Sequence, residues 1–271
     1  MSIYFIGDIH GCYDELCKLL DIINYDDNND QLLLTGDLIF RGDKSLEVLK
    51  LIYKLKNTNI VLGNHELNLL ALYNGILLKN SIFSITKNMF YSSKIEELIN
   101  WLKSQPILLF NKIKKFIVVH AGILPFWSTR KIIKYSKEIE FLLTSNYCKH
   151  FLYFLFKNIL NEELLELFTL RKLKCIKFNI NVFTRIRYYY NYYQLDNKYL
   201  GIPINRPTYL IPWFNKVQIL NKYSIIFGHW SILAGKYTPN KIYNIDTGCC
   251  WGKKLTALCW DNKKYYYINK S

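Results

Sequence analysis

The residues of this chain that are suited to chemistry stand at the ends of five short apolar runs. The stretch Gly63-Asn64-His65-Glu66 shows the pattern, because it follows the apolar residues 60–62 and opens a segment with helical spacing. Carboxylate and amide oxygens and imidazole nitrogens are ligands for hard and borderline divalent cations. Side chains of these kinds in comparable turns are Asp8, His10, Asp37, Asn64, His65, His120 and His229. Their recurrence favours a metal centre.

These side chains are widely separated in the sequence, so the fold has to bring them together. A strand that turns at once into a helix leaves its turn residues at the mouth of a sheet, where ligands collect in α/β folds. The carboxyl ends of parallel strands lie along one edge of their sheet. We therefore expect the five turns to converge on one crevice.

The predicted ligands suit a pair of ions. Apart from His65, whose ring titrates near neutral pH, the set comprises two carboxylates, three imidazoles and one amide. A set without a thiolate favours Mn²⁺, Fe, Co or Zn. A shared carboxylate would hold two ions about 3.5–4 Å apart, the spacing of two-metal phosphoryl chemistry, in which a bridging water becomes hydroxide. Arg41, shortly after Asp37, would then clamp phosphate oxygens bidentately.

Taken singly, each of these residues has an ordinary structural explanation. A Gly-Asp pair is usually only a turn, a buried histidine is more often hydrogen-bonded than a metal ligand, and Asn64 alone would be a helix cap. The metal hypothesis depends on their joint occurrence at five strand ends.

The remaining pattern predicts a mixed α/β fold. Strand–turn–helix units follow one another from the N-terminus, which favours parallel pairing through crossovers. Strands are predicted at 3–6, 32–34, 60–62, 116–119, 225–227 and 242–245, with a closing hairpin of 255–260 and 265–268. Residues 76–109 are predicted as mostly helical, and 182–193 are ambiguous. We expect one domain over 1–271 with a mostly helical cap insertion over 126–200.

Composition argues against several classes of protein. A hydrophobic fraction of 51% in 271 residues argues against disorder and allows a large core. No apolar run reaches the roughly 20 residues that a bilayer requires, and the first residues lack a signal-peptide pattern, so we expect no membrane segment and no signal peptide. The seven cysteines include no Cys-x-x-Cys pair to suggest a zinc site. Their odd number and the adjacency of Cys249 and Cys250, which disfavours a bond between them, favour reduced thiols in a cytoplasmic protein.

The formal charge of +15 suggests nucleic acid as a partner, but the kinds of basic residue that supply this charge weaken the interpretation. Only six of the 36 basic residues are arginine, and Asn, Ile and Tyr are also heavily used. These residue types have AT-rich codons, so genomic base drift explains much of the charge. A polyanionic substrate would still be attracted. The nearest approach to a nucleic-acid surface is the tyrosine run 188–193 beside Arg185 and Arg187.

The motifs together resemble those of the calcineurin-like metallophosphoesterases. The blocks 7–11, 36–42 and 63–66 are similar to the three signature blocks of that family, and His120 and His229 to its two later metal histidines. Within the family the match is closer to the bacterial symmetrical diadenosine tetraphosphatases. The segments that carry this closer match are 120–123, 183–188, 212–214, 228–230 and 246–258. The resemblance runs from Ile3 to about Trp260 and is weakest over 126–175.

The resemblance implies a sandwich of two mixed sheets flanked by helices, with a helical cap insertion and a dinuclear centre. Site one would be Asp8, His10 and Asp37, and site two would be Asp37, Asn64, His120 and His229, with Asp37 bridging. His65 would lie over the leaving group, Arg41 on the substrate phosphates, and Arg185 and Arg187 near the outer phosphates. Family enzymes usually use Mn²⁺ or Co²⁺, and Fe or Zn are the alternatives.

The implied activity is hydrolysis of diadenosine tetraphosphate to two ADP, by attack of a metal-activated hydroxide on the β-phosphorus. The implied partner is a dinucleoside polyphosphate substrate, with no membrane and no obligate protein partner. Three alternatives stay open: a protein or small-molecule phosphomonoesterase on the same scaffold, a non-catalytic nucleotide-binding protein, and removal of nucleoside-tetraphosphate caps from RNA. The basic surface would help the last of these.

Two positions depart from the family pattern. The protein-phosphatase branch places an aspartate directly before the arginine, paired with the catalytic histidine, whereas this chain has Phe40 where the tetraphosphatases usually carry a small residue. Asp43-Lys44 stands where the branch usually has Pro-Gly. ADP leaves as a phosphate whose protonated form has a pKa of about 6. We therefore expect an unsupported His65 to suffice for an anhydride and to serve a phosphoserine poorly.

Overall fold

The computed structural model of the chain describes residues 1–77, 89–191, 194–217, 219 and 222–270. Its first sheet has the order β12-β11-β1-β2-β3. The bounds are β1 (Ile3–Ile6), β2 (Gln31–Leu34), β3 (Thr58–Ile60), β11 (Lys254–Cys259) and β12 (Tyr265–Asn269). β1, β2 and β3 run parallel, whereas β11 is antiparallel to both β1 and β12. The carboxyl ends of three strands thus lie at one edge.

The second sheet has the order β10-β9-β5-β4. Its bounds are β4 (Leu108–Asn111), β5 (Phe116–Val119), β9 (Ser224–Phe227) and β10 (Ile242–Asn244). β5, β9 and β10 are parallel, and β4 pairs antiparallel with β5. A small third sheet consists of β7 (Gln194–Asp196), β6 (Tyr188–Asn191) and β8 (Ile211–Pro212).

The two large sheets pack against each other through a core of their own. Side chains alternate along a strand, so Phe5 of β1 and Leu33 of β2 point to this core while their neighbours face the helices. The ring of Phe5 meets that of Phe116 on β5 edge-on, with centroids 5.1 Å apart, and Trp260 contacts both rings. Burying each such side chain stabilises the fold by roughly 1.5–3 kcal/mol.

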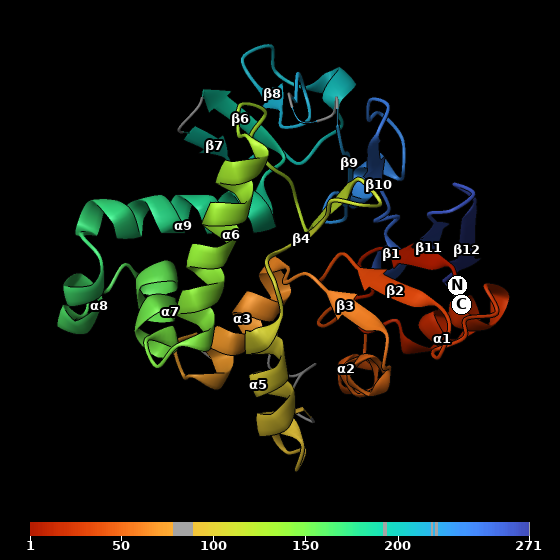
Figure 1. Cartoon of the computed structure of the whole chain (residues 1–271), viewed down its shortest axis with the longest axis horizontal. Coiled ribbons are helices and arrows are strands. Elements are labelled where there is room, and N and C mark those ends of the chain that lie inside the picture. Colours follow the sequence, from red (N-terminus) through yellow and green to blue (C-terminus); the bar gives the residue numbers. More distant parts are fainter. Residues whose placement is uncertain (78–88, 192–193, 218, 220–221, 271) are drawn as a thin grey trace.

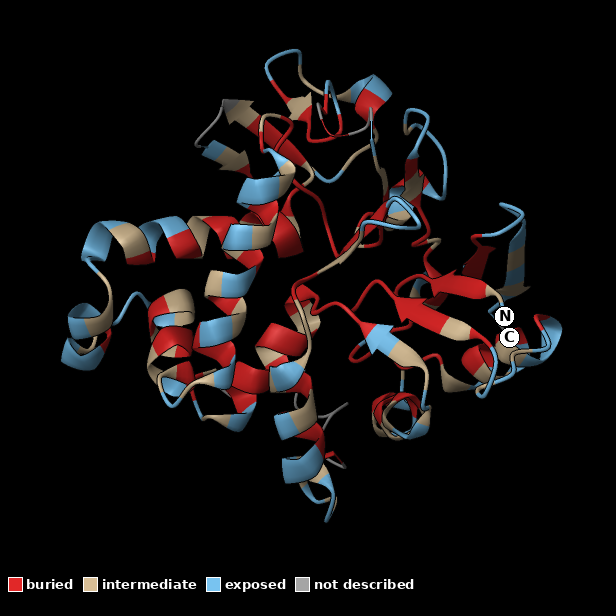
Figure 2. Cartoon of the chain, in the orientation of Figure 1, coloured by how far each residue is buried: buried red, intermediate tan, exposed pale blue. Residues whose placement is uncertain are grey.

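Helices cover the outer surfaces of this sandwich. Their bounds are α1 (Tyr13–Ile22), α2 (Ser45–Lys54), α3 (Asn64–Tyr73), α5 (Ile95–Ser104), α6 (Thr129–Thr144), α7 (Cys148–Lys157), α8 (Glu162–Leu167) and α9 (Leu170–Arg185). α1 packs on β11 and β12 with Leu16 and Leu19 fully buried. In Figure 2, β1 and β2 are buried along much of their length, and helices such as α6 alternate between buried and exposed residues, whereas α3 is buried over most of its length.

Helices α6 to α9 gather on the left of Figure 1, beside the sandwich. Side-chain caps start three of them: Ser128 accepts from the Lys131 N–H before α6, Asn161 caps α8 and Thr169 caps α9. α9 ends at Arg185, because Ile186 is already extended. This end of α9 lies next to the strand ends of the second sheet, where the backbone N–H of Ala121 donates to the Phe183 carbonyl.

The predicted fold class is confirmed, and the closing hairpin lies where expected. The prediction of helix through residue 109 is wrong, because Leu108–Asn111 form β4. Only Leu108 of this edge strand is buried, so its four residues lack the continuous apolar signal of the inner strands. Residues 78–88 of that predicted helical stretch lie outside the described part of the chain.

The ambiguous stretch 182–193 divides into the end of α9 and strand β6, with residues 192–193 outside the described part. Tyr188 is fully buried and Tyr189 nearly so, so these two tyrosines belong to the core rather than to a surface for nucleic acid. Within the described residues, no helix is both long and apolar enough to span a bilayer. The division of the chain into one domain with an insertion over 126–200 stays a prediction.

Candidate metal centre

The strand ends of both large sheets meet at a cavity of about 520 Å³. Asp8 follows β1, Asp37 follows β2, Asn64 begins α3 after β3, and His229 follows β9. The predicted site residues that line the cavity are Asp8, His10, Asp37, Arg41, Asn64, His65, Arg185, Arg187 and His229. His120 follows β5, is fully buried and contacts this group directly. The structure therefore brings together all the residues that the sequence singled out.

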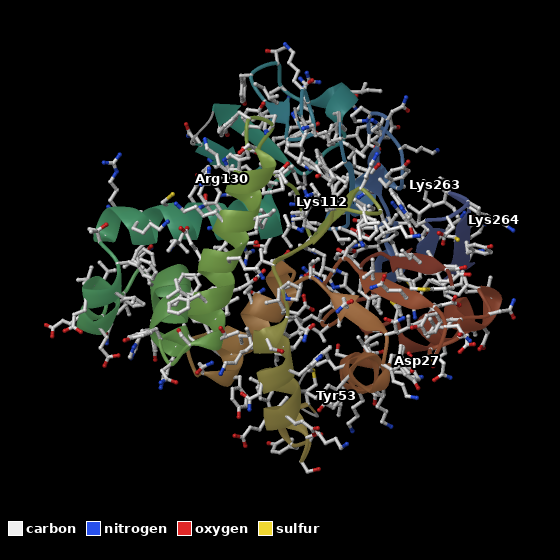
Figure 3. The ribbon with its side chains drawn as sticks, in the orientation of Figure 1. Asp27, Tyr53, Lys112, Arg130, Lys263 and Lys264 are labelled. Carbon is white, nitrogen blue, oxygen red and sulfur yellow. The ribbon has the colours of Figure 1, made fainter. Side chains whose placement is uncertain are left out.

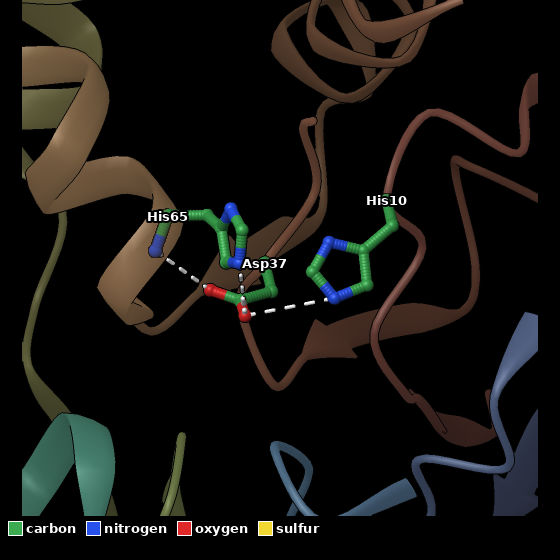
Figure 4. A group of neighbouring side chains, drawn as sticks. All are labelled: His10, Asp37 and His65. Carbon is green, nitrogen blue, oxygen red and sulfur yellow. Dashed lines mark hydrogen bonds and ion pairs between the residues drawn. The ribbon is translucent and has the colours of Figure 1, made fainter. Parts of the chain in front are cut away.

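The carboxylate of Asp37 is the centre of the group. Its Oδ2 lies 3.4 Å from His120 Nε2, 3.7 Å from His10 Nε2 and 3.8 Å from His65 Nε2. Figure 4 shows the rings of His10 and His65 facing this carboxylate from two sides. Although burial acts to raise it, the pKa of Asp37 is lowered to about 2 by the surrounding imidazoles, most strongly by His120. Asp37 is thus an anion at neutral pH.

Three histidines have their tautomers fixed by backbone carbonyls. The acceptors for His10 Nδ1, His120 Nδ1 and His229 Nε2 are the carbonyls of Ile39, Thr35 and Arg185, at 3.0, 2.8 and 3.2 Å. A carbonyl oxygen only accepts, so each of these nitrogens carries the ring proton. The other nitrogen of each ring is left as a lone pair. This is the arrangement that orients metal-binding imidazoles in proteins.

The unprotonated ring nitrogens of His120 and His229 face each other with no proton between them. His120 Nε2 lies 3.2 Å from His229 Nδ1 and 3.2 Å from the side-chain oxygen of Asn64. Burial lowers the pKa of both His120 and His229, so protonation of the rings does not relieve the repulsion. A divalent cation among these donors would relieve it, and nitrogen and oxygen donors of this kind suit such a cation. The residues therefore fit one metal ion at this position.

A second group of donors lies on the other side of Asp37. Asp8 is buried, accepts from Thr35 Oγ1 at 3.1 Å and from the His229 N–H at 2.9 Å, and faces Asp246. Burial raises the pKa of Asp8 well above its usual range, and the charges of Asp246 and Asp37 raise it further. Burial also raises the pKa of Asp246 to about 6. A divalent cation beside these carboxylates and His10 would offset the repulsion between them, and oxygen and nitrogen donors of this kind suit such a cation.

Asp246 was not among the predicted site residues. It follows β10 in the same way that the predicted residues follow their own strands, and it lines the same cavity. The signal that would have found it was therefore present in the sequence, since Asp246-Thr247-Gly248 ends a predicted strand.

Several residues of the site have a strained backbone. His10, Asp37 and His229 have φ of 49°, 49° and 61°, which is the left-handed region. Side chains at such positions cost of order 1–3 kcal/mol each, and they persist only where the surrounding structure holds them. Phe40 and Arg41 follow with φ of 67° and 69°. Left-handed residues such as Asn24 and Asn158 also occur outside the site, but in these turns the strain aims the donors, as is common at functional sites.

Glu66 ties two of these turns together. Its carboxylate accepts backbone N–H groups of Asp37, Leu38 and Gly63, each at 2.8 Å, and the side chain is fully buried. Burial raises the pKa of Glu66 to about 7, and the three N–H donors oppose that rise. The turn after β2 and the start of α3 are thereby fixed relative to each other.

His65 differs from the three oriented histidines. Its Nδ1 is buried and has no hydrogen-bond partner in the described part of the chain. The ring of Phe40 lies 5.3 Å from the His65 ring, so a phenyl group stands where the protein-phosphatase branch would offer a carboxylate. Burial lowers the pKa of His65 to about 4, although Asp37 opposes this shift. His65 is therefore neutral at pH 7.

Three guanidinium groups surround the donors. Arg41 is exposed at the rim, whereas Arg185 and Arg187 lie mostly buried, and burial lowers the pKa of both. Arg187 Nη2 donates to the His229 carbonyl at 3.0 Å, and Arg185 Nη2 donates to Asn68 at 3.4 Å. Arginines around a buried cation site suit a ligand with several phosphates, because each guanidinium can bind two phosphate oxygens.

Comparison with known proteins identifies the family. The family model for calcineurin-like phosphoesterases matches residues 1–230, and the chain belongs to this family. It is 48% identical over 270 residues to the symmetrical bis(5'-nucleosyl)-tetraphosphatase of Baumannia cicadellinicola subsp. Homalodisca coagulata, covering 99% of this chain and 92% of that protein. It is 45% identical over 276 residues to the protein of the same name from Wigglesworthia glossinidia brevipalpis, covering 99% of both.

Solved structures agree on the fold. A crystal structure assigned as a diadenosine tetraphosphatase aligns with a TM-score of 0.65 at 18% identity, over 100% of this chain and 94% of that one. The cold-active protein-tyrosine phosphatase of a psychrophilic Shewanella species aligns with a TM-score of 0.60, also at 18% identity, over 100% of this chain and 80% of that one. At this identity the likeness bears on the fold alone. The family implies divalent metal ions, for which the described residues provide candidate clusters.

Proposed function

We propose that the chain hydrolyses diadenosine tetraphosphate symmetrically, splitting the bridge in its middle and releasing two ADP. The near-full-length similarity to symmetrical tetraphosphatases supports this activity. The observation that carries the proposal is that nitrogen and oxygen donors without a proton converge on both sides of Asp37. Three arginines line the same cavity. A tetraphosphate bridge supplies both the reacting phosphorus and the outer phosphates that such a site suits.

We propose a separate set of ligands for each of two ions, with Asp37 shared between the two sets. Asp8, His10 and Asp37 would hold one ion, and Asp37, Asn64, His120 and His229 would hold the other. When bound, such a pair supplies hydroxide near neutral pH and stabilises charge on the reacting phosphate. Mn²⁺ or Co²⁺ is our proposed choice, with Fe or Zn as alternatives, because the donors are oxygen and imidazole nitrogen.

The other residues of the site bind and orient. Arg41 at the rim, with Arg185 and Arg187 deeper in, would hold the phosphates of the bridge. His65 would lie over the leaving ADP. Because the leaving phosphate is a weak base, a neutral His65 that offers a hydrogen bond is sufficient, and no oriented imidazolium is required.

Product analysis tests the proposal. The purified chain with added Mn²⁺ is expected to convert diadenosine tetraphosphate to ADP alone. ATP with AMP would indicate asymmetric cleavage, and orthophosphate would indicate a phosphomonoesterase. A phosphoserine peptide serves as the comparison substrate, and we expect its kcat/KM to be at least about 100-fold lower. Equal efficiency on the peptide and the dinucleotide would refute the role given to the unsupported His65.

His65→Ala should separate catalysis from metal binding. We expect the variant to keep its metal ions, because the three oriented imidazoles and both carboxylates are unchanged. Its kcat should fall about 100-fold, the usual effect of losing a proton-handling side chain. Elemental analysis and steady-state kinetics measure the two effects. His150→Ala is the matched control, since His150 pairs with Glu163 away from the centre; loss of metal from His65→Ala alone would make His65 a ligand instead.

We also propose that residues 126–200 form a mostly helical cap beside the centre. Support comes from α9, whose last residue, Arg185, lines the cavity. A cytoplasmic location is proposed as well, supported by seven cysteines that are all unbonded.

Capped RNA is a second candidate substrate, because a basic cavity of about 550 Å³ lies elsewhere on the surface. Its lysines are Lys112, Lys114, Lys115, Lys222 and Lys241. Figure 3 places Lys112 at the end of β4, and Lys263 and Lys264 between β11 and β12. Such a group of lysines would attract an RNA backbone. Release of a nucleoside diphosphate from nucleoside-tetraphosphate-capped RNA, compared with the free dinucleotide at the same salt concentration, decides between the substrates.

A further inference from the structure

One large aromatic side chain at the centre is exposed without a structural reason. Trp251 ends the short 3₁₀ helix η4 (Cys249–Trp251), keeps 56% of its surface exposed and lines the cavity of the metal centre. Glycines with left-handed backbones stand on both sides of η4, at Gly248 and Gly252, with φ of 78° and 75°. The loop is thus shaped to present Trp251 outward rather than to bury it.

Two further apolar side chains share this rim. Leu200, in the segment after β7, is 59% exposed, and Ile232, in the 3₁₀ helix η3 (Ser231–Leu233), is 45% exposed. Both line the same cavity as Trp251. A single exposed apolar residue is ordinary, but three from separate segments around one highly charged cavity indicate a ligand with an apolar part.

The position of Arg41 indicates how this apolar part is connected to the rest of the ligand. Its guanidinium carbon lies 5.1 Å from the centroid of the Trp251 ring, a cation–π contact. Arg41 also lines the cavity beside the phosphate-binding side chains. It therefore stands between an aromatic surface and a polyphosphate site. A nucleotide has the same order of groups, with a planar base joined through a sugar to its phosphates.

We infer that Trp251 is the stacking platform for one nucleobase of the substrate, with Leu200 and Ile232 as its apolar surroundings. This inference rests on the proposed function and adds the residue that recognises the base. The indole keeps 56% of its surface exposed although Arg41 lies over its ring, and a base would stack on that exposed surface. Stacking on an aromatic side chain is tolerant of base identity, because every base has a π face.

The two nucleosides of the substrate are then bound unequally. The substrate is symmetric about its middle phosphate bond, but the described lining of the cavity offers one exposed aromatic platform, Trp251. Among the described residues that line the cavity, the other tryptophan is Trp230, which is buried against Tyr188 and Phe214 and cannot receive a base. On the side away from Trp251, these residues therefore hold the second nucleoside chiefly through its phosphates.

Kinetics of Trp251→Ala and Trp251→Phe test the platform. We expect W251A to raise KM for diadenosine tetraphosphate about tenfold and W251F at most about threefold, since phenylalanine keeps an aromatic face. Inorganic tetraphosphate, which has the phosphates but no base, should inhibit W251A with a Ki within about twofold of the wild-type value. Equal increases in KM and Ki would overturn the inference, because Trp251 would then only hold Arg41 in place.

Tyr267→Ala is the matched control for these kinetics. Tyr267 is 53% exposed on β12, and Lys254 lies over its ring with Nζ 3.8 Å from the centroid. This pair repeats the contact of an exposed aromatic ring with a cation, but neither residue lines the cavity. A rise in KM for Tyr267→Ala equal to that for W251A would also overturn the inference.

A binding measurement separates this inference from the proposed function. Titration of the Mn²⁺-loaded chain with ADP should quench part of the tryptophan fluorescence, and W251F should abolish that quench. Trp101→Phe should leave it intact, since Trp101 packs on Tyr53 in α2, away from the cavity lining. A quench that survives in W251F overturns the platform. Failure of the wild type to produce ADP from the dinucleotide overturns the proposed function, and the ADP titration still decides the role of Trp251.

Discussion

Asp37→Ala is expected to remove both metal ions and to lower kcat/KM by at least about 10⁴-fold. Asp37 faces three imidazole nitrogens at once, at 3.4–3.8 Å. Without it, neither group of donors is complete, and the hydroxide that the ions would supply at neutral pH is lost. The same result is expected for Asp37→Asn, which keeps the shape and tolerates the left-handed backbone at φ of 49°.

Two measurements check this prediction. Elemental analysis after dialysis against Mn²⁺ should find metal in the wild type and none in either variant. Mn²⁺ at about one hundred times its Kd should stabilise the wild type by about 2.7 kcal/mol, which corresponds to a rise in Tm of about 5–10 °C. The variants should show no such rise. Asp14→Ala, which removes an exposed partner of Lys44, is the control that keeps both metal and Tm shift. Full metal content in Asp37→Asn would contradict the bridging role.

Gly63→Ala is expected to damage the centre nearly as much, although the residue carries no functional group. A Cβ at this position would collide with Asp37 Oδ1 and lie 2.9 Å from both the Asp37 nitrogen and His120 Nδ1. Gly63 has an ordinary φ of −92°, so the effect is steric and not one of backbone strain. Asp37 Oδ1 also accepts the His65 N–H at 3.0 Å, which leaves the carboxylate little freedom to move aside. We expect activity to fall at least about 10³-fold, with a loss of about 1–3 kcal/mol in the free energy of unfolding.

Gly75→Ala is the control that isolates this collision. Gly75 lies just beyond α3 at φ of 71°, and an added Cβ would meet nothing within 4 Å. Its substitution should lower the free energy of unfolding by about 1–2 kcal/mol, because of backbone strain, and leave the metal content unchanged. The comparison therefore separates loss of stability from loss of the site. Gly63→Ala with a full complement of metal would show that Asp37 does not need its present position.

The sequence was sufficient to predict most of the centre. Asp8, Asp37 and His229 were recognisable because each follows a short apolar strand, and strand ends of parallel sheets meet. β4 was missed because an edge strand with three partly exposed residues lacks that apolar signal. Trp251 was missed as a site residue because an exposed aromatic residue in a loop belongs to no periodic pattern.

The tautomers of the histidines were beyond prediction. His10, His120 and His229 are each oriented by a backbone carbonyl, and every residue carries one. The three-dimensional course of each turn determines which carbonyl lies within hydrogen-bonding distance of a ring. The type of residue that carries the carbonyl does not. The same holds for Glu66, whose three donors are backbone N–H groups of two separate turns.

The donors of the centre come from both large sheets: Asp37 and Asn64 from the first, His120 and His229 from the second. The reach from the donors of one sheet to those of the other therefore depends on the gap across the sandwich, and the rings of Phe5 and Phe116 pack in that gap. A change in the volume of these rings would alter the spacing of the donors, and hence how well they would hold metal ions, without touching the cavity. The size of the side chains in the interior of this protein thus affects the chemistry at its surface cavity.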